Sequence, residues 1–230
     1  MSLLQEIQND VTNSNVSVSN LLRKCKILAY KLGNEDFKTW VEYELNGYPK
    51  DKKFLPNYRI LKNVYSKGHF SGSFGSGIQN ADVPTFNLPK ELQENLTTAN
   101  FFSPIATLEN LTTTTASTLS QEWGATVLAL HGNNMYEGYV CMQAWKVIPT
   151  SFVIGIVDTI KTKILNFVLE IEMIDKNAGD VAINSNPIPQ DKINQIFNIN
   201  ITGNVQNLAS GNNQSTIDQK VFSDDISQTL

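Results

Sequence analysis

Residues Leu21 to Tyr48 read LLRKCKILAYKLGNEDFKTWVEYELNGY, and this stretch decides how the chain begins to fold. In its first half, apolar residues recur at three- and four-residue steps, which is typical of one helical face; they are Leu21, Leu22, Cys25, Leu28, Ala29 and Leu32. Gly33 favours the positive φ that closes a helix, and Asn34 is suited to cap the next one. A second apolar face follows, made by Phe37, Trp40, Val41 and Leu45. The stretch predicts two helices joined by a tight corner.

Carboxylates also occur in the second of these helices. Glu35 and Asp36 fall in its first turn, where negative charge meets the positive end of the helix dipole. We interpret Glu42 and Glu44 as residues of the helix surface. Because nothing in the pattern isolates a general acid or base, we expect this hairpin to be a scaffold and not a catalytic site.

Composition indicates a folded protein and argues against a broad surface for nucleic acid. The 230 residues are 41% hydrophobic and 17% charged, and the net charge is −4. Arg23 and Arg59 are the only arginines, whereas phosphate-binding surfaces depend on clustered lysine and arginine. Nucleic acid is therefore not expected as a partner. Cys25 and Cys141 are the only cysteines, which excludes a disulfide framework or a zinc ribbon within the chain.

The middle of the chain alternates between strand and helix patterns. Residues 58–74 and 139–148 are rich in β-branched and aromatic residues, and we expect both to be strands. Residues 152–174 predict a long helix that is apolar over much of its girth, but its charged residues exclude a membrane span. Together these patterns predict an α+β fold with a helical hairpin, a small antiparallel β element and a long central amphipathic helix. No secretory signal is apparent at Met1, so we expect a cytoplasmic protein.

The last part of the chain predicts a separate element. Residues 184–190, NSNPIPQ, are typical of a linker between a domain at 1–183 and an Asn/Gly-rich tail at 191–230. In this tail, apolar residues alternate with asparagine and threonine, which predicts a β-strand. An isolated strand exposes unpaired backbone groups, so we expect it to pair between subunits of a homo-oligomer. The expected interface consists of Phe197, Ile199, Ile201, Val205 and Leu208.

Two stretches carry a resemblance to a known family. They are the hairpin at 21–48 and the run from Trp145 to Ser151, which continues through Gly155–Asp158 to Glu170. Both resemble the AbiTii family, bacterial proteins associated with abortive infection during phage attack. The resemblance implies a role in which the infected cell stops supporting phage growth. It supplies no established catalytic residues.

The glycine-rich segment GHFSGSFGSG at residues 68–77 offers an alternative site. It lacks the lysine followed by serine or threonine that a P-loop needs, and we interpret it first as a bulged strand ending in a turn. A nucleotide cradle of backbone amides is the alternative, and its residues would be His69, Gly72, Gly75 and Gly77. Neither histidine lies in a paired metal motif, so we expect no metal and no cofactor.

Three hypotheses of function follow. The first is an anti-phage component that works through protein–protein interaction and self-assembly, without catalysis of its own. The second is a nucleotide-responsive or nucleic-acid-directed effector enzyme that uses residues 68–77. The third is a structural partner of another defence protein, inert alone. We expect the first, with a partner defence protein or a phage-encoded trigger as its binding partner.

Overall fold

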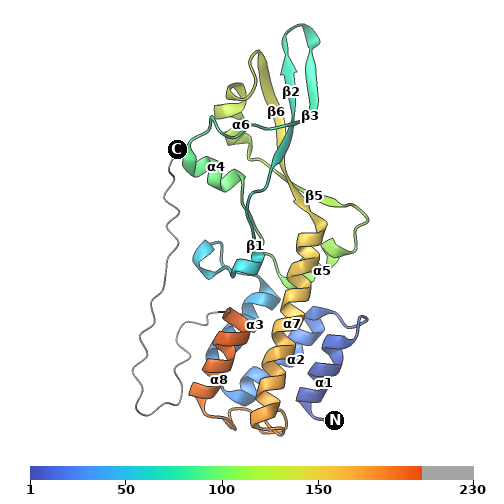
Figure 1. Ribbon diagram of the computed structural model, residues 1–230, viewed down its shortest axis with the longest axis vertical. Coiled ribbons are helices and arrows are strands. Elements are labelled where there is room, and N and C mark those ends of the chain that lie inside the picture. Colours follow the sequence, from blue (N-terminus) through green and yellow to red (C-terminus); the bar gives the residue numbers. More distant parts are fainter. Residues whose placement is uncertain (204–230) are drawn as a thin grey trace, which may run out of the picture.

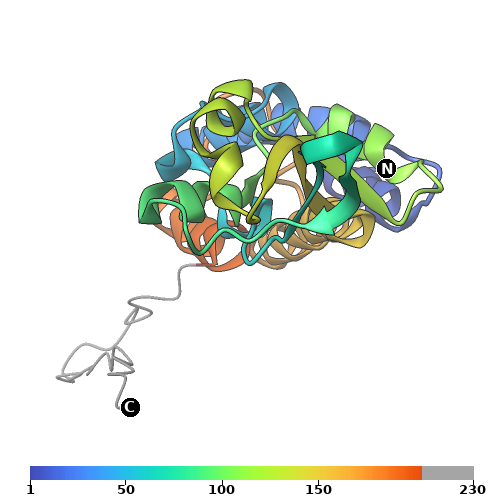
Figure 2. The same cartoon turned by 90° about the horizontal axis from the view of Figure 1, so that it is seen from above.

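A computed structural model describes residues 1–203 of the chain. The molecule is elongated, with helices at one end and an antiparallel sheet at the other (Figure 1). Viewed along the long axis, the sheet end lies over the helical end (Figure 2). The long helix α7 (Thr150–Ile174) follows directly from strand β6 (Tyr139–Pro149), and this continuous segment joins the two ends. The α+β class predicted from the sequence is confirmed.

The N-terminal helices form as their capping residues predict. They are α1 (Leu3–Thr12), α2 (Val18–Leu32) and α3 (Glu35–Asn46). Gly33 ends α2 with a φ of 62°, a left-handed conformation that glycine adopts without strain. The Asn34 side chain accepts a hydrogen bond from the Phe37 N–H and begins α3 one residue later. The tight corner of the hairpin is confirmed.

The main hydrophobic core is helical, and α7 runs through it. The hairpin, α1, α5 (Ile105–Thr112) and α8 (Gln190–Phe197) all pack against α7. On α7 the side chains of Val153, Ile160, Ile164, Phe167, Val168 and Ile171 are completely buried. Burying one such side chain stabilises the fold by roughly 1.5–3 kcal/mol. The helix predicted at 152–174 is therefore confirmed as the central element of the helical region.

A four-stranded antiparallel sheet forms the other end. Its strand order is β3 (Gly77–Asp82), β2 (Ser66–Gly72), β6 and β5 (Thr118–Glu122). Helices α4 (Lys90–Leu96) and α6 (Ala125–His131) flank this sheet, and a small second core lies around Phe70, Trp123 and Cys141. A two-stranded ladder of β1 (Ile60–Leu61) and β4 (Ala99–Asn100) lies between the sheet and the helices. Short 3₁₀ turns occur at Lys52–Phe54, Asn57–Arg59, Ser73–Gly75 and Gly132–Asn134.

The strand predicted from Phe197 is wrong for Phe197–Thr202. Phe197 ends α8, and Asn198–Thr202 form a π-helical turn that Gly203 closes. The segment fits two patterns at once. Its apolar residues Ile193, Phe197 and Ile201 are spaced by four, as on one face of a helix, and the alternation after Phe197 also fits the two-residue period of a strand. The helix prevails because it buries all three side chains in the main core. The remaining tail residues named for the interface, Val205 and Leu208, lie outside the described residues.

Helix α8 is also fastened to the hairpin corner by polar contacts. The Asn34 side-chain amide donates to Asn194 Oδ1 at 2.6 Å and to Gln190 Oε1 at 3.1 Å. Gln190 Nε2 in turn donates to the Leu32 carbonyl at 2.8 Å. Upstream, the irregular segment at 184–189 buries Ile188 in the main core. The residues expected to begin a separate tail thus pack as part of the helical region up to Gly203.

Candidate functional site

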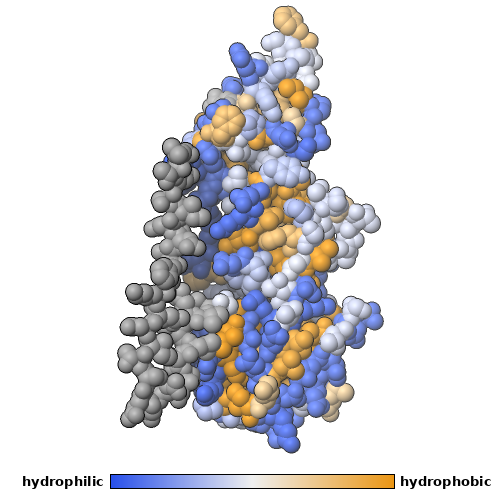
Figure 3. Space-filling view, viewed as in Figure 1, coloured by the Kyte–Doolittle hydropathy of each residue, from blue (hydrophilic) through white to orange (hydrophobic). Residues whose placement is uncertain are grey.

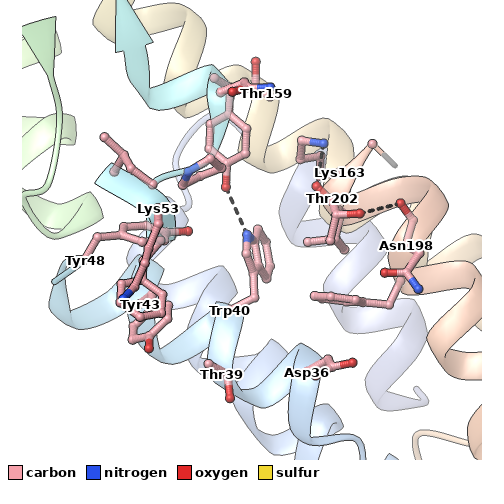
Figure 4. A pocket seen from close by; sticks show the side chains of 18 residues that line it. Asp36, Thr39, Trp40, Tyr43, Tyr48, Lys53, Thr159, Lys163, Asn198 and Thr202 are labelled. Carbon is pink, nitrogen blue, oxygen red and sulfur yellow. Dashed lines mark hydrogen bonds between the residues drawn. The ribbon is translucent and has the colours of Figure 1, made fainter. Parts of the chain in front are cut away.

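A pocket of about 870 Å³ opens between α3, α7, the end of α8 and the loop at residues 53–58 (Figure 4). Helix α3 presents one face to it, made by Asp36, Thr39, Trp40 and Tyr43, which follow the three- and four-residue steps of a helix. Helix α7 contributes Thr159 and Lys163, four residues apart on the facing side. The aromatic side chains among the lining residues are Trp40, Tyr43, Tyr48, Phe54, Tyr58 and Phe197.

A buried ion pair lies beneath this pocket. Glu44 of α3 and Arg59 are both completely inaccessible to solvent, and the Arg59 Nη2 atom pairs with Glu44 Oε2. Arg59 Nη1 also donates to the carbonyls of Phe101 and Ser103, at 2.9 and 2.8 Å. The interpretation of Glu44 as a surface residue is therefore wrong. Because an uncompensated buried charge is costly, each member of the pair depends on the other.

Three aromatic residues turn their polar atoms toward this ion pair. The hydroxyls of Tyr48 and Tyr58 donate to Glu44 Oε1 at 2.7 and 2.6 Å, and Trp40 Nε1 donates to the Tyr58 hydroxyl at 3.0 Å (Figure 4). Burial raises the pKa of both tyrosine hydroxyls well above its usual value, and the neighbouring Glu44 carboxylate raises it further. Both hydroxyls thus stay protonated donors, and the network holds the aromatic rings in place.

Lys163 occupies the opposite wall. Its Nζ atom donates to the carbonyls of Asn200 and Ile201, at 3.2 and 2.7 Å, in the π-helical turn that follows α8. It also stands 5.4 Å from the centre of the Tyr58 ring. Burial lowers the pKa of the Lys163 ammonium, although the Glu44 carboxylate opposes that shift. Turns of π-helix are rare and occur often at functional sites.

The site proposed at residues 68–77 has a different structure. The segment forms most of strand β2, a register shift between His69 and Phe70, and the turn that leads to β3. His69 Nδ1 accepts a hydrogen bond from the Asn80 N–H at 3.1 Å, and its ring packs edge-on against Trp145. The bulged strand ending in a turn is confirmed. The cavity that His69 lines holds about 240 Å³.

Gly72, Gly75 and Gly77, the glycines named for the nucleotide cradle, do not line the cavity that His69 lines. A Cβ atom at Gly72 would meet the Ser76 and Tyr139 side chains at 2.5 and 2.8 Å, so the turn itself needs glycine there. Gly75 has a φ of 75° and open space around it, and Gly77 begins β3. Their positions are explained by backbone conformation and packing.

Two of the residues named for a subunit interface line the aromatic pocket instead. Phe197 and Ile201 are 6% and 1% exposed and belong to the main core of their own chain. Ile199, between them, is half-buried. The described residues thus give these two side chains a structural role within one subunit.

Sequence reasoning missed this pocket, although one signal was present. Glu44 follows Trp40 by four residues and Val41 by three, which places its carboxylate on the apolar face of α3. A charge at such a position demands a buried partner, and Arg59 is one of only two arginines. The pocket also needs the π-helical turn at Asn198–Thr202, where the alternating pattern instead predicted a strand.

Over residues 1–203, no three or more His, Cys, Asp and Glu side chains come together in a way that could hold a metal ion. Within the same range, none of the helices combines the length and apolarity that crossing a membrane requires.

Comparison with known proteins yields one match. No curated protein and no solved structure matches the chain. The model of the AbiTii family matches residues 2–219, which includes both stretches that carry the resemblance, the pocket and helix α8. That family points to phage defence by abortive infection. A match over nearly the whole length establishes that this chain belongs to the AbiTii family.

Proposed function

We propose that this chain is an anti-phage component that acts through binding and self-association, without catalysis of its own. The observation that carries the proposal is the aromatic pocket above the Glu44–Arg59 pair. Its volume of about 870 Å³ falls in the range of sites that bind small molecules or anchor side chains. A buried ionic network beneath such a wall keeps the rings in one geometry, which favours binding because little order is lost when a ligand enters.

The same network argues for binding over catalysis. The Glu44 carboxylate is enclosed by Arg59 and two tyrosine hydroxyls, and burial keeps those hydroxyls protonated. The Lys163 ammonium is held by two backbone carbonyls. A general acid or base needs access to the proton that it transfers. Here Glu44, the two tyrosine hydroxyls and Lys163 are engaged in positioning the walls of the pocket.

A plaque assay tests the defence role and its dependence on the pocket. Cells that express the chain alone are expected to show fewer plaques than cells with an empty vector, and to die early when every cell is infected. Thr39→Trp fills the pocket from an exposed position on α3, and protection is expected to disappear. Thr162→Trp, exposed on α7 outside the pocket, is the matched control and should protect like the wild type.

Each outcome of this assay is informative. Absence of protection by the wild-type chain alone would overturn the proposal, and protection only beside a neighbouring gene would favour a structural partner role. Protection by folded Thr39→Trp equal to that of the wild type would remove the pocket from the mechanism. Unchanged melting temperatures of both tryptophan variants would show that any loss comes from the filled pocket.

Self-association is proposed to reside in the chain after Gly203. Phe197 and Ile201 are used in the core and Ile199 lies in the π-helical turn, which leaves Val205 and Leu208 from the predicted interface. Light scattering of the full chain is expected to give an oligomer, and of a Val205→Asp/Leu208→Asp variant a smaller species, since charge opposes apolar strand pairing. A Ser210→Asp/Asn212→Asp variant adds the same charge at polar positions. Equal masses for all three proteins would overturn the assembly role.

A further inference from the structure

The aromatic residues that line the pocket expose mainly their rings to the cavity and few polar atoms. The polar atoms of three aromatic residues already form hydrogen bonds within the buried network; they are the hydroxyls of Tyr48 and Tyr58 and the indole Nε1 of Trp40. These three residues therefore present the face or edge of a ring to the cavity; Figure 4 labels Trp40 and Tyr48 among them. Tyr43 and Phe54 extend the wall, with ring centres 6.3 Å apart. Flat, rigid aromatic walls favour a flat aromatic ligand.

The charge in the pocket adds a second requirement. The Lys163 ammonium is half-buried, yet within the described chain its hydrogen-bond acceptors are two neutral carbonyls, and no carboxylate forms an ion pair with it. Burial lowers the pKa of Lys163, the Glu44 carboxylate partly opposes that shift, and an anion placed beside the ammonium would oppose it further. An ammonium has three donors, so one remains beyond the two carbonyls. A ligand anion would complete the set.

Other charges along the pocket agree with this placement. Lys53 also lines the pocket, but its ammonium already pairs with Asp51 Oδ2 at 2.9 Å, which leaves Lys163, among the lining residues that the structure describes, as the cation for a ligand. Asp36 lies on α3 beside Thr39, at the bottom of Figure 4, away from Lys163 at the top. An anionic group would thus be directed toward Lys163 and away from Asp36. The ring that carries it would rest against the aromatic walls.

We propose that this pocket binds a free nucleotide, with its base against the rings around Trp40 and Tyr43 and its phosphate against Lys163. Base–aromatic stacking tolerates any base, and a phosphate pairs with an ammonium through charge-assisted hydrogen bonds. A single nucleotide fits the net charge of −4 better than a nucleic-acid strand, which needs a basic track along its backbone. The inference rests on the proposed function, in that it takes this pocket as the working part of the protein.

Calorimetric titration of the purified full chain tests the proposal. The probes are AMP, GMP, CMP and UMP, with adenosine as the ring without phosphate and ribose 5-phosphate as the phosphate without a base. We expect at least one nucleotide to bind, AMP to bind about tenfold or more tightly than adenosine, and ribose 5-phosphate not to bind. A single-stranded oligonucleotide forms a separate arm, in which no tighter binding than by the mononucleotide is expected.

Variants of Lys163 and Thr39 test whether the phosphate contacts Lys163 and the base contacts the aromatic rings. Lys163→Met should reduce the affinity for AMP to that for adenosine and leave adenosine unchanged, whereas Lys163→Arg should retain most of the difference. Lys161→Met, on the same helix and outside the pocket lining, should bind like the wild type. Thr39→Trp should abolish binding of both AMP and adenosine. It also keeps the proposal testable if Lys163→Met fails to fold.

Several results would overturn the proposal. They are no binding of any of the four nucleotides at millimolar concentration, equal affinity for AMP and adenosine, undiminished binding by Thr39→Trp, or binding of the oligonucleotide alone. Phage protection is measured separately, so the two ideas can fail independently. A chain that protects cells but binds no nucleotide keeps its defence role with another ligand. A chain that binds a nucleotide but does not protect keeps the site and loses the role.

Discussion

The helical region and the sheet region of this molecule bury their side chains to different depths. In the helical region most core side chains have no solvent exposure, and even an ion pair, Glu44 with Arg59, is completely enclosed. The sheet region has a smaller core, and its β2–β3 hairpin extends away from the rest of the molecule at the top of Figure 1. In the space-filling view, a pale apolar side chain caps this hairpin (Figure 3). The deep core builds the pocket, because only dense packing can hold a buried charge and a rigid aromatic wall together.

The largest expected effect comes from breaking the buried ion pair. Glu44→Ala leaves the Arg59 guanidinium buried without a counter-charge and takes the acceptor from two tyrosine hydroxyls. We expect the free energy of unfolding to fall by about 3–5 kcal/mol, measured by urea denaturation followed by circular dichroism. Glu42→Ala, two residues earlier, breaks the pair that Glu42 makes with Lys26 at the surface, and should cost about 1 kcal/mol or less.

A double variant separates charge from packing in the same network. Glu44→Leu combined with Arg59→Met removes both charges and fills the space with apolar side chains. Because replacing a whole buried pair is often neutral, the double variant should recover the part of the stability that the uncompensated Arg59 charge costs, while the two tyrosine hydroxyls still lack their acceptor. If Glu44→Ala and Glu42→Ala destabilise the protein equally, the buried network does not hold the pocket as we describe.

An intermediate effect is expected from crowding the sheet region. A Cβ atom at Gly68 would stand 2.7 Å from the Gln143 carbonyl oxygen and 3.1 Å from Val83 Cγ2, and the backbone cannot yield easily. Gly68→Ala should therefore lower the free energy of unfolding by about 1–3 kcal/mol. Gly124→Ala, where the added methyl group meets open space, is the matched control and should leave stability almost unchanged. Equal effects at both positions would contradict a packing role for Gly68.

The reactivity of the two cysteines measures how often each region opens to solvent. Cys25 is completely buried in the helical core, and Cys141 is 3% exposed in the smaller sheet core. Burial raises the pKa of both thiols, so neither should react with iodoacetamide until the region around it opens. We expect Cys141 to be labelled about tenfold faster than Cys25 or more, as measured by peptide mass spectrometry. A factor of ten corresponds to a difference of about 1.4 kcal/mol between the free energies of opening the two regions. Faster labelling of Cys25 would reverse the comparison.

Local features of the helical region could be predicted from the sequence, whereas its long-range contacts could not. The hairpin corner depends on two adjacent residues, Gly33 and Asn34, so a local pattern predicts it correctly. The ion pair joins residues 15 positions apart across the end of α3, and no local pattern specifies that contact. The helical turn at Asn198–Thr202, which follows α8, could not be predicted because the alternation of Ile and Asn there also fits a strand, and burial against α7 decides between them. The pocket combines both kinds of contact, which is why sequence reasoning identified helices α3 and α7 but not the pocket between them.

The smallest effect is expected at the tip of the hairpin. Phe74 is fully exposed and has a φ of 56°, a conformation that asparagine tolerates better than phenylalanine. Phe74→Asn removes no buried contact, so the free energy of unfolding should change by less than about 0.5 kcal/mol. Phage protection should also persist, because the proposed working site lies in the helical region, far from this tip (Figure 1). If a stable Phe74→Asn protein no longer protects cells, the functional surface lies in the sheet region instead. The helical core would then serve only as the support from which the β2–β3 hairpin extends.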